Sequence, residues 1–314
     1  MLETLTIGTV AFDSARHLSL NLRLTKFLNP KSEYSWIILD NSPEGSSLCI
    51  KKENPDYFYL PRVETDFKGK GFESYQHGSG LNEIMQYVKS RYVLILDPDF
   101  YITRPNWINE VLNFLDEEKI SIFGAPWHPN WFYKYRYFPC AHCLFLDLKN
   151  VEKESIDFCP EPDNSNKWNS KMRFFFKVLR QEKRCFIGTS FDTGVKLYRK
   201  YATKKVHLNI CLVPSFRPYY GMSLIKKNMM KALDAVLPDE LSLIPKVAGY
   251  FWTKTFADLG YFDAYSNGWE EFYWEGKPFG FHLRRFQTSK RKTVDEEIDL
   301  LKKSLRSFGL NSDG

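Results

Sequence analysis

Residues 92–99 constrain the fold more than any other part of this chain of 314 residues, because five apolar residues end in two carboxylates one residue apart. The run Tyr92-Val93-Leu94-Ile95-Leu96 is typical of a strand buried on both faces, as in a parallel sheet covered by helices. Ligands of such sheets bind at the carboxyl ends of the strands. Asp97 and Asp99, with Pro98 fixing the backbone between them, therefore predict an oxygen site for Mg²⁺ or Mn²⁺ that also takes phosphate oxygens. The same three residues also suit a simple turn, so the ends of the other strands are needed to decide between a metal site and a turn.

Two more strands are expected upstream, at residues 5–11 and 35–43, with apolar residues at helical spacing over residues 14–28 between them. This order is a βαβ unit. The second strand also ends in polar residues, Asp40 and Asn41. We therefore expect an α/β fold in which helices flank a mostly parallel central sheet, with helical and hairpin elaborations toward the C-terminus.

In this order, residues 37–42 (Ile-Ile-Leu-Asp-Asn-Ser), a helix carrying Gly80-Leu81-Asn82, and residues 96–99 (Leu-Asp-Pro-Asp) resemble the nucleotide-binding half of GT-A glycosyltransferases, especially the inverting family-2-like group. The likeness covers residues 1–150. It implies a Rossmann-like GT-A fold and a nucleotide-diphosphate sugar as donor. It further implies that Asp40 contacts the nucleotide base and that Asp97 and Asp99 hold a divalent cation on the diphosphate.

His77 and Asn82 flank a Gly-rich segment that we expect at the start of the helix before the Asp97 strand, where free N–H groups suit phosphate or ribose. The glycine spacing is incomplete for a dinucleotide-binding fold, and the chain has no Walker element. Lys68, Lys70 and Arg285 are further phosphate contacts to consider. The residues that we assign to nucleotide-sugar binding are Ala11, Asp40, Asn41, His77, Asn82, Asp97 and Arg284.

Asp192, before an expected helix at residues 195–203, either caps that helix or acts as the general base that takes the proton of the acceptor hydroxyl. Glu270, beside Glu271, is the second catalytic candidate. The aromatic segment 272–285 predicts a hairpin around Gly276-Lys277. Because many GT-A enzymes add a downstream histidine to the two aspartates, the resemblance makes His282 the third metal ligand. Inversion at the sugar also rests on the resemblance.

We expect one GT-A domain at residues 1–290, with a nucleotide-sugar half (1–150) and an acceptor half (151–290), followed by an amphipathic helix or tail at 291–314. A helical run is expected at residues 172–179. The aromatic loop 131–138 either stacks on an acceptor sugar or packs over the sheet. Residues 222–237 form a basic amphipathic helix that docks on the core or touches a membrane surface, where lipid-linked acceptors reside.

The six cysteines have no dense spacing, which favours free thiols in a reducing compartment. Cys140-Ala141-His142-Cys143 lacks the second pair of ligands that a structural zinc site needs. No segment approaches the ~20 apolar residues of a spanning helix, and no leader is evident. We expect a cytoplasmic protein, with peripheral contact at the inner face of a membrane as an additional expectation.

The expected partners are a nucleotide-diphosphate sugar and a glycan or lipid-linked acceptor, in polysaccharide biosynthesis, and not nucleic acid. The net charge of +6 is too small to choose a partner, and the basic residues are not interleaved with aromatics as single-stranded nucleic acid would require. Two alternatives stay open. One is a nucleotidyltransferase, although residues 9–16 lack its Gly-rich basic motif. The other is a non-catalytic glycan- or nucleic-acid-binding protein on a degenerate transferase fold, against which the intact Asp-x-Asp argues.

Overall fold

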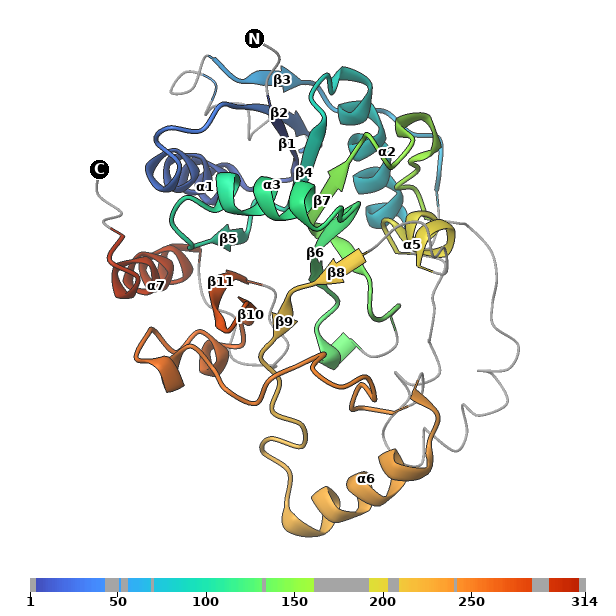
Figure 1. The fold of residues 1–314 in the computed structure, drawn as a ribbon, viewed down its shortest axis with the longest axis vertical. Coiled ribbons are helices and arrows are strands. Elements are labelled where there is room, and N and C mark those ends of the chain that lie inside the picture. Colours follow the sequence, from blue (N-terminus) through green and yellow to red (C-terminus); the bar gives the residue numbers. More distant parts are fainter. Residues whose placement is uncertain are drawn as a thin grey trace.

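The larger of two sheets contains seven strands in the order β3-β2-β1-β4-β7-β6-β8 (Figure 1). Four of its six strand pairings are parallel, and only β7 runs antiparallel to its neighbours β4 and β6. The expected mostly parallel α/β sheet is thus confirmed. Its strands are β1 (Leu5–Ala11), β2 (Tyr34–Asp40), β3 (Phe58–Leu60), β4 (Tyr92–Leu96), β6 (Ile122–Pro126), β7 (Pro139–Asp147) and β8 (Asn209–Cys211).

These features come from a computed structural model that describes most of the chain. The described residues are 4–42, 51, 56–68, 71–131, 134–160, 192–202, 209–239, 242–283 and 294–310. The expected helix at 172–179 lies outside them, as do Lys70, Arg284 and Arg285.

A smaller antiparallel sheet has the order β5-β11-β10-β9. Its strands are β5 (Phe100–Ile102), β9 (Val213–Pro214), β10 (Glu270–Trp274) and β11 (Lys277–His282). Strands β10 and β11 form the expected hairpin, and β5 pairs with β11 so that Phe100 lies opposite His282. Because β5 follows β4 after only three residues, this small sheet starts at the carboxyl edge of the large one.

Helices cover both faces of the large sheet. Leu94 and Leu96 of β4 join a core cluster with helices α1 and α3, whereas Val93 and Ile95 face a second cluster with α2 and α5. This alternation shows that β4 is buried on both faces, as its apolar run predicts. The helices are α1 (Ala15–Leu28), α2 (Phe72–Tyr87), α3 (Trp107–Glu117), α5 (Val195–Tyr201), α6 (Leu224–Val236) and α7 (Val294–Ser307).

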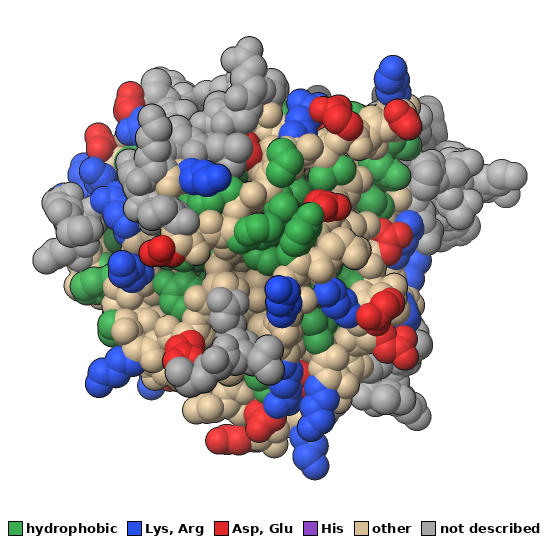
Figure 2. Space-filling model, turned by 90° about the horizontal axis from the view of Figure 1, so that it is seen from above, with side chains coloured by type: hydrophobic (Ala, Val, Ile, Leu, Met, Phe, Trp, Pro, Cys, Tyr) green, Lys and Arg blue, Asp and Glu red, His purple; other side chains and the backbone are tan. Residues whose placement is uncertain are grey.

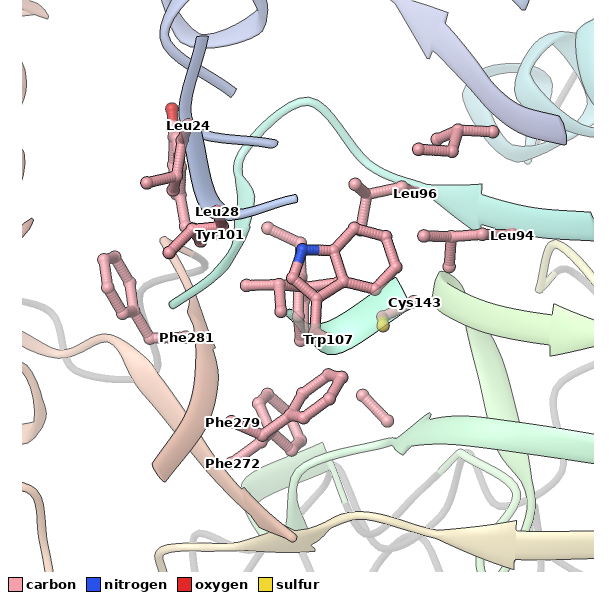
Figure 3. Packing of buried hydrophobic residues seen from close by; sticks show 14 of the residues in the cluster. Leu24, Leu28, Leu94, Leu96, Tyr101, Trp107, Cys143, Phe272, Phe279 and Phe281 are labelled. Atoms are coloured by element: carbon pink, nitrogen blue, oxygen red, sulfur yellow. The ribbon is translucent and has the colours of Figure 1, made fainter. Parts of the chain in front are cut away.

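The two sheets share a core around the indole ring of Trp107 (Figure 3). This ring lies between Leu96 of the large sheet and Phe272 and Phe279 of the small sheet. The C-terminal helix α7 joins the same cluster through buried residues such as Leu301. The small sheet is therefore fixed against the large one by a continuous apolar core, which holds strand ends from both sheets together.

Helix α2 begins at Phe72, earlier than the sequence suggests, so the expectation that Gly78 and Gly80 open the helix is wrong. Each glycine costs about 1 kcal/mol in a helix relative to alanine. Both are needed for close packing, because a Cβ at Gly78 would lie 2.7 Å from the carbonyl oxygen of Phe158, and one at Gly80 would lie 3.0 Å from Val10. The glycines therefore let α2 approach β1 and the segment after β7, and they do not form a phosphate-binding N-terminus.

Basic and acidic side chains are interspersed on the face seen from the β3 end, and no large patch of one sign appears there (Figure 2). None of the described helices is both long and apolar enough to cross a bilayer.

Candidate metal and ligand-binding site

Asp97 and Asp99 lie in a tight turn directly after β4. The turn is closed by the Phe100 amide, which donates to the carbonyl of Asp97 at 3.1 Å. The side chain of Asn21 on α1 donates to the carbonyl of Phe100 at 2.8 Å and approaches that of Pro98 at 3.4 Å. Helix α1 thus fixes the turn, and both carboxylates are held at the carboxyl edge of the large sheet.

His282 reaches this turn through the pairing of β5 with β11. The amide of Leu283 donates to the carbonyl of Asp99 at 3.1 Å, and Nε2 of His282 lies 3.3 Å from Oδ1 of Asp99. One ligand atom from each of Asp97, Asp99 and His282 lies within 4.8 Å of the others. The structure therefore brings together three residues that are far apart in the sequence and that were predicted to share a metal.

Glu270, on β10, holds the other nitrogen of this imidazole. Its Oε2 lies 3.0 Å from Nδ1 of His282, and its Oε1 accepts a 2.6 Å hydrogen bond from the indole of Trp131. Burial lowers the pKa of His282, but Asp99 and Glu270 outweigh it and raise the pKa to about 9. A carboxylate on the far nitrogen fixes the ring and leaves Nε2 for a ligand, as is common for metal-bound histidines.

The donor set fits a hard divalent cation. Two carboxylates and one imidazole suit Mn²⁺ or Mg²⁺ and leave positions for phosphate oxygens and water. A second cluster of His142, Glu270 and His282 shares the last two residues and is buried throughout. The carboxylate pair is more open, since the side chains of Asp97 and Asp99 are 18% and 38% exposed. The accessible cluster is therefore the better cation site.

No zinc site forms at residues 140–143 in the described part of the chain. Cys140 and Cys143 belong to different core clusters, and neither of the two potential metal clusters contains a cysteine. The thiol of Cys140 instead lies 2.8 Å from Nδ1 of His142, whose ring stacks on His282 with 4.8 Å between centroids. His142 thus supports the imidazole of His282 from one side.

A cavity of about 230 Å³ opens beside Asp97. His77 lines it with Nε2 3.5 Å from Oδ1 of Asp97, and Asp192 lines it from the opposite half of the chain. The structure thus gathers three predicted residues around one space. The other lining residues are Glu73, Ser74, Trp127, Lys134, Ala141, His142 and Thr193.

Asp192 is almost fully buried and forms an ion pair with Lys134, whose ammonium group also lies 4.8 Å from the ring centroid of Trp127. Helix α5 starts after Gly194 without a side-chain cap, so the interpretation of Asp192 as a capping residue is wrong. Its Oδ2 has no hydrogen-bond partner among the described residues. Asp192 therefore lines the cavity with a carboxylate whose buried Oδ2 is not hydrogen-bonded by any described residue.

Four other described residues that were predicted to bind the nucleotide sugar do not line this cavity. Ala11 and Asp40 lie opposite each other at the same sheet edge, and Asp40 accepts hydrogen bonds from the amide and hydroxyl of Ser42. Asn41 exchanges hydrogen bonds with Gln76 of α2. These residues brace the ends of β1 and β2 against α2.

Asn82, the fourth of these residues, forms its hydrogen bonds away from the cavity. Its side-chain amide donates to Asp157 at 2.9 Å and its oxygen accepts from the amide of Phe158, so it fixes the segment after β7. The sequence analysis did not identify Asn21 and Lys134. Asn21 contacts Phe100, which is 79 residues away in the chain, and Lys134 contacts Asp192, which is 58 residues away. The only sequence signal for Lys134 is its place in the aromatic loop 131–138.

No family model and no curated protein matches the sequence. Solved structures that are similar to this chain include a mannosyltransferase and a galactosyltransferase. They include TarS of S. aureus (15% identity, TM-score 0.38), whose match covers 49% of this chain and only 30% of TarS. The mannosyltransferase PcManGT from Pyrobaculum calidifontis, solved with GDP-Man and Mn²⁺, matches at 12% identity over 76% of this chain and 77% of its own, with a TM-score of 0.38.

Glucosyl-3-phosphoglycerate synthase from Mycobacterium tuberculosis, solved with Mn²⁺ and UDP-glucose, matches at 11% identity over 59% of this chain and 68% of its own, with a TM-score of 0.37. Similarity this low assigns no activity and no residue role to the chain. Any functional conclusion must come from the site itself.

Proposed function

We propose that the protein is a metal-dependent glycosyltransferase that moves a sugar from a nucleotide-diphosphate sugar to a glycan or lipid-linked acceptor, with inversion. The observation that supports this most is the cluster of Asp97, Asp99 and His282, with ligand atoms within 4.8 Å at the carboxyl edge of the sheet and a cavity beside it. Ligands of α/β sheets bind at this edge.

In this proposal Asp97, Asp99 and His282 hold Mn²⁺ or Mg²⁺, which supplies positive charge that stabilises the leaving diphosphate. Asn21 keeps the two aspartates in their turn, and Glu270 keeps Nε2 of His282 directed at them. Each therefore acts by reducing the freedom of a ligand.

Asp192 is the proposed general base. It takes the proton of the acceptor hydroxyl as that oxygen forms a bond to the anomeric carbon and the bond from that carbon to the diphosphate breaks. The proposal is supported by its position in the cavity wall and by its Oδ2, which is unpartnered among the described residues. The ammonium group of Lys134 stabilises the ionised carboxylate before the hydroxyl arrives.

The test is thermal stabilisation by UDP, GDP, dTDP and CDP, each with and without Mn²⁺. Ligand at 100 times its dissociation constant stabilises the native state by about 2.7 kcal/mol. For a chain of this length that corresponds to a rise of about 4 °C in Tm. We expect this rise for one nucleotide, only with Mn²⁺, and its loss in Asp99→Asn.

Asp299→Asn, on the exposed side of α7, is the matched control and should respond like the wild type. Absence of a shift with every diphosphate would contradict the proposal. The same melts repeated with the four nucleoside triphosphates test nucleotidyl transfer, which a shift with a triphosphate alone would favour.

A further inference from the structure

Helix α6 carries a continuous apolar stripe on its outer face. Ile225, Met229 and Val236 are 77%, 58% and 80% exposed, and Ala232 is exposed as well. The intervals of four, three and four residues place all four side chains on one side of the helix. The stripe is therefore one surface and not a scatter of exposed residues.

The opposite side of α6 already docks on the protein. Met230 and Asp234 are buried there, and the Asp234 carboxylate accepts hydrogen bonds from the hydroxyl of Tyr219 at 3.0 Å and the amide of Leu243 at 2.8 Å. Figure 1 shows α6 at the end of the molecule opposite β3. The apolar stripe thus faces outward because the helix is held by its other side.

Positive charge flanks the stripe. Lys226 and Lys231 lie on either side of it, and the one acidic residue of α6, Asp234, is buried on the far side. A cavity of about 550 Å³ adjoins the helix, and its wall includes Arg217, Lys227, Lys231 and Lys246 as well as the hydrogen-bonded Asp234. An apolar strip bordered by lysines beside a basic cavity matches an anionic lipid surface in both polarity and charge.

We propose that α6 docks this protein on anionic membranes, with the stripe at the boundary of headgroups and acyl chains and the lysines at lipid phosphates. Leu224, 73% exposed, and Tyr220, 60% exposed, extend the apolar surface at the start of the helix. Pairing of this face with a second copy is disfavoured, because it would bring the lysines of two helices together. The inference does not depend on the proposed transferase activity.

The docking helix is connected to the candidate site. Asp239, shortly after α6, accepts hydrogen bonds from Arg136 and, at 2.6 Å, from the hydroxyl of Tyr137. These residues follow Lys134, which lines the cavity beside Asp97. A membrane bound at α6 would therefore be linked through a short hydrogen-bonded segment to the wall in which Asp192 lies.

The experiment is flotation of the full chain with vesicles of phosphatidylcholine alone and with added phosphatidylglycerol. We expect binding to the anionic vesicles and loss of it in Ile225→Asp/Met229→Asp. Lys226→Ser/Lys231→Ser should weaken partitioning about 30-fold, since each lysine near an anionic surface contributes about fivefold. Phe27→Asp, which places one such negative charge at an apolar side chain of α1 that is 59% exposed, is the control and should bind normally.

Thermal melting establishes that each variant is folded, and all substituted side chains are solvent-exposed in the structure. The proposal is overturned if the wild type ignores anionic vesicles or if Ile225→Asp/Met229→Asp binds them as well as the wild type. It is also overturned if the chain is a dimer in light scattering that this double variant converts to monomers, because the stripe would then belong to a second copy.

Discussion

Glu271 offers a stability test that depends on a single buried carboxyl group. It is fully buried on β10, where Oε2 accepts hydrogen bonds from the amide of Phe256 at 2.8 Å and the hydroxyl of Ser215 at 3.0 Å, and Oε1 accepts from the amide of Tyr265 at 3.0 Å. Burial raises the pKa of Glu271 to about 7, although these hydrogen bonds lower it. The side chain therefore links the segment before β10 to the core. The free energy needed to keep its carboxyl group buried depends on pH.

The direction in which stability changes with pH follows from proton binding. The folded state holds the proton up to about pH 7, whereas the unfolded chain releases it near the ordinary value of 4.5. Between these values the folded state binds more protons, so the contribution of Glu271 to stability falls as the pH rises and is constant above about pH 7. The shift corresponds to about 3 kcal/mol, or about 4 °C in Tm for a chain of this length.

Glu271→Gln preserves the size of the side chain and removes the titration. Thermal melts followed by circular dichroism from pH 5 to 8 should show that the Tm of the wild type, relative to that of the variant, falls by about 4 °C across this range. All other titrations cancel in this difference. Glu117→Gln, on an exposed position of α3, is the control and should give a constant difference. A difference that stays constant or grows with pH for Glu271→Gln would refute the reasoning.

Two further changes probe the site and its support. Glu270→Ala should weaken Mn²⁺ binding 10- to 100-fold, measured by electron paramagnetic resonance, because His282 loses the group that orients its ring; unchanged affinity would show that Glu270 does not act through the metal ligand. Gly78→Ala should lower the free energy of unfolding in urea by about 1–3 kcal/mol, because the added methyl meets the backbone of Phe158. Ser79→Ala is the neighbouring control, and equal effects of the two substitutions would contradict this packing argument.

The parts of the fold that were predicted correctly are those governed by local pattern. The apolar run before Asp97 predicts a strand buried on both faces, and Val93 and Leu94 do pack into different core clusters. The hairpin of β10 and β11 likewise follows from its aromatic residues and the Gly276 turn. In both cases the signal lies within about ten residues, where side-chain periodicity and turn chemistry dominate.

The features of the fold and the site that were not predicted depend on contacts between distant segments. Glycine is a poor helix former, which is why the start of α2 was placed too late; the close approach of Phe158 that makes Gly78 necessary cannot be seen in the sequence. The antiparallel direction of β7 was also not predicted, because it depends on contacts between distant segments. The same holds for the hydrogen bond between Glu270 and His282. Asp97 and Asp99 were paired from their spacing, whereas His282 was added to them only through a family resemblance, because its proximity depends on the β5–β11 register.

The most direct test of the account is an anomalous difference map from crystals soaked with Mn²⁺ and the nucleoside diphosphate that gives the largest thermal shift. We predict one Mn²⁺ peak bonded to Asp97, Asp99 and Nε2 of His282, with diphosphate oxygens completing its coordination. A peak held by His142 and Glu270 instead, or nucleotide bound away from the two aspartates, would contradict it.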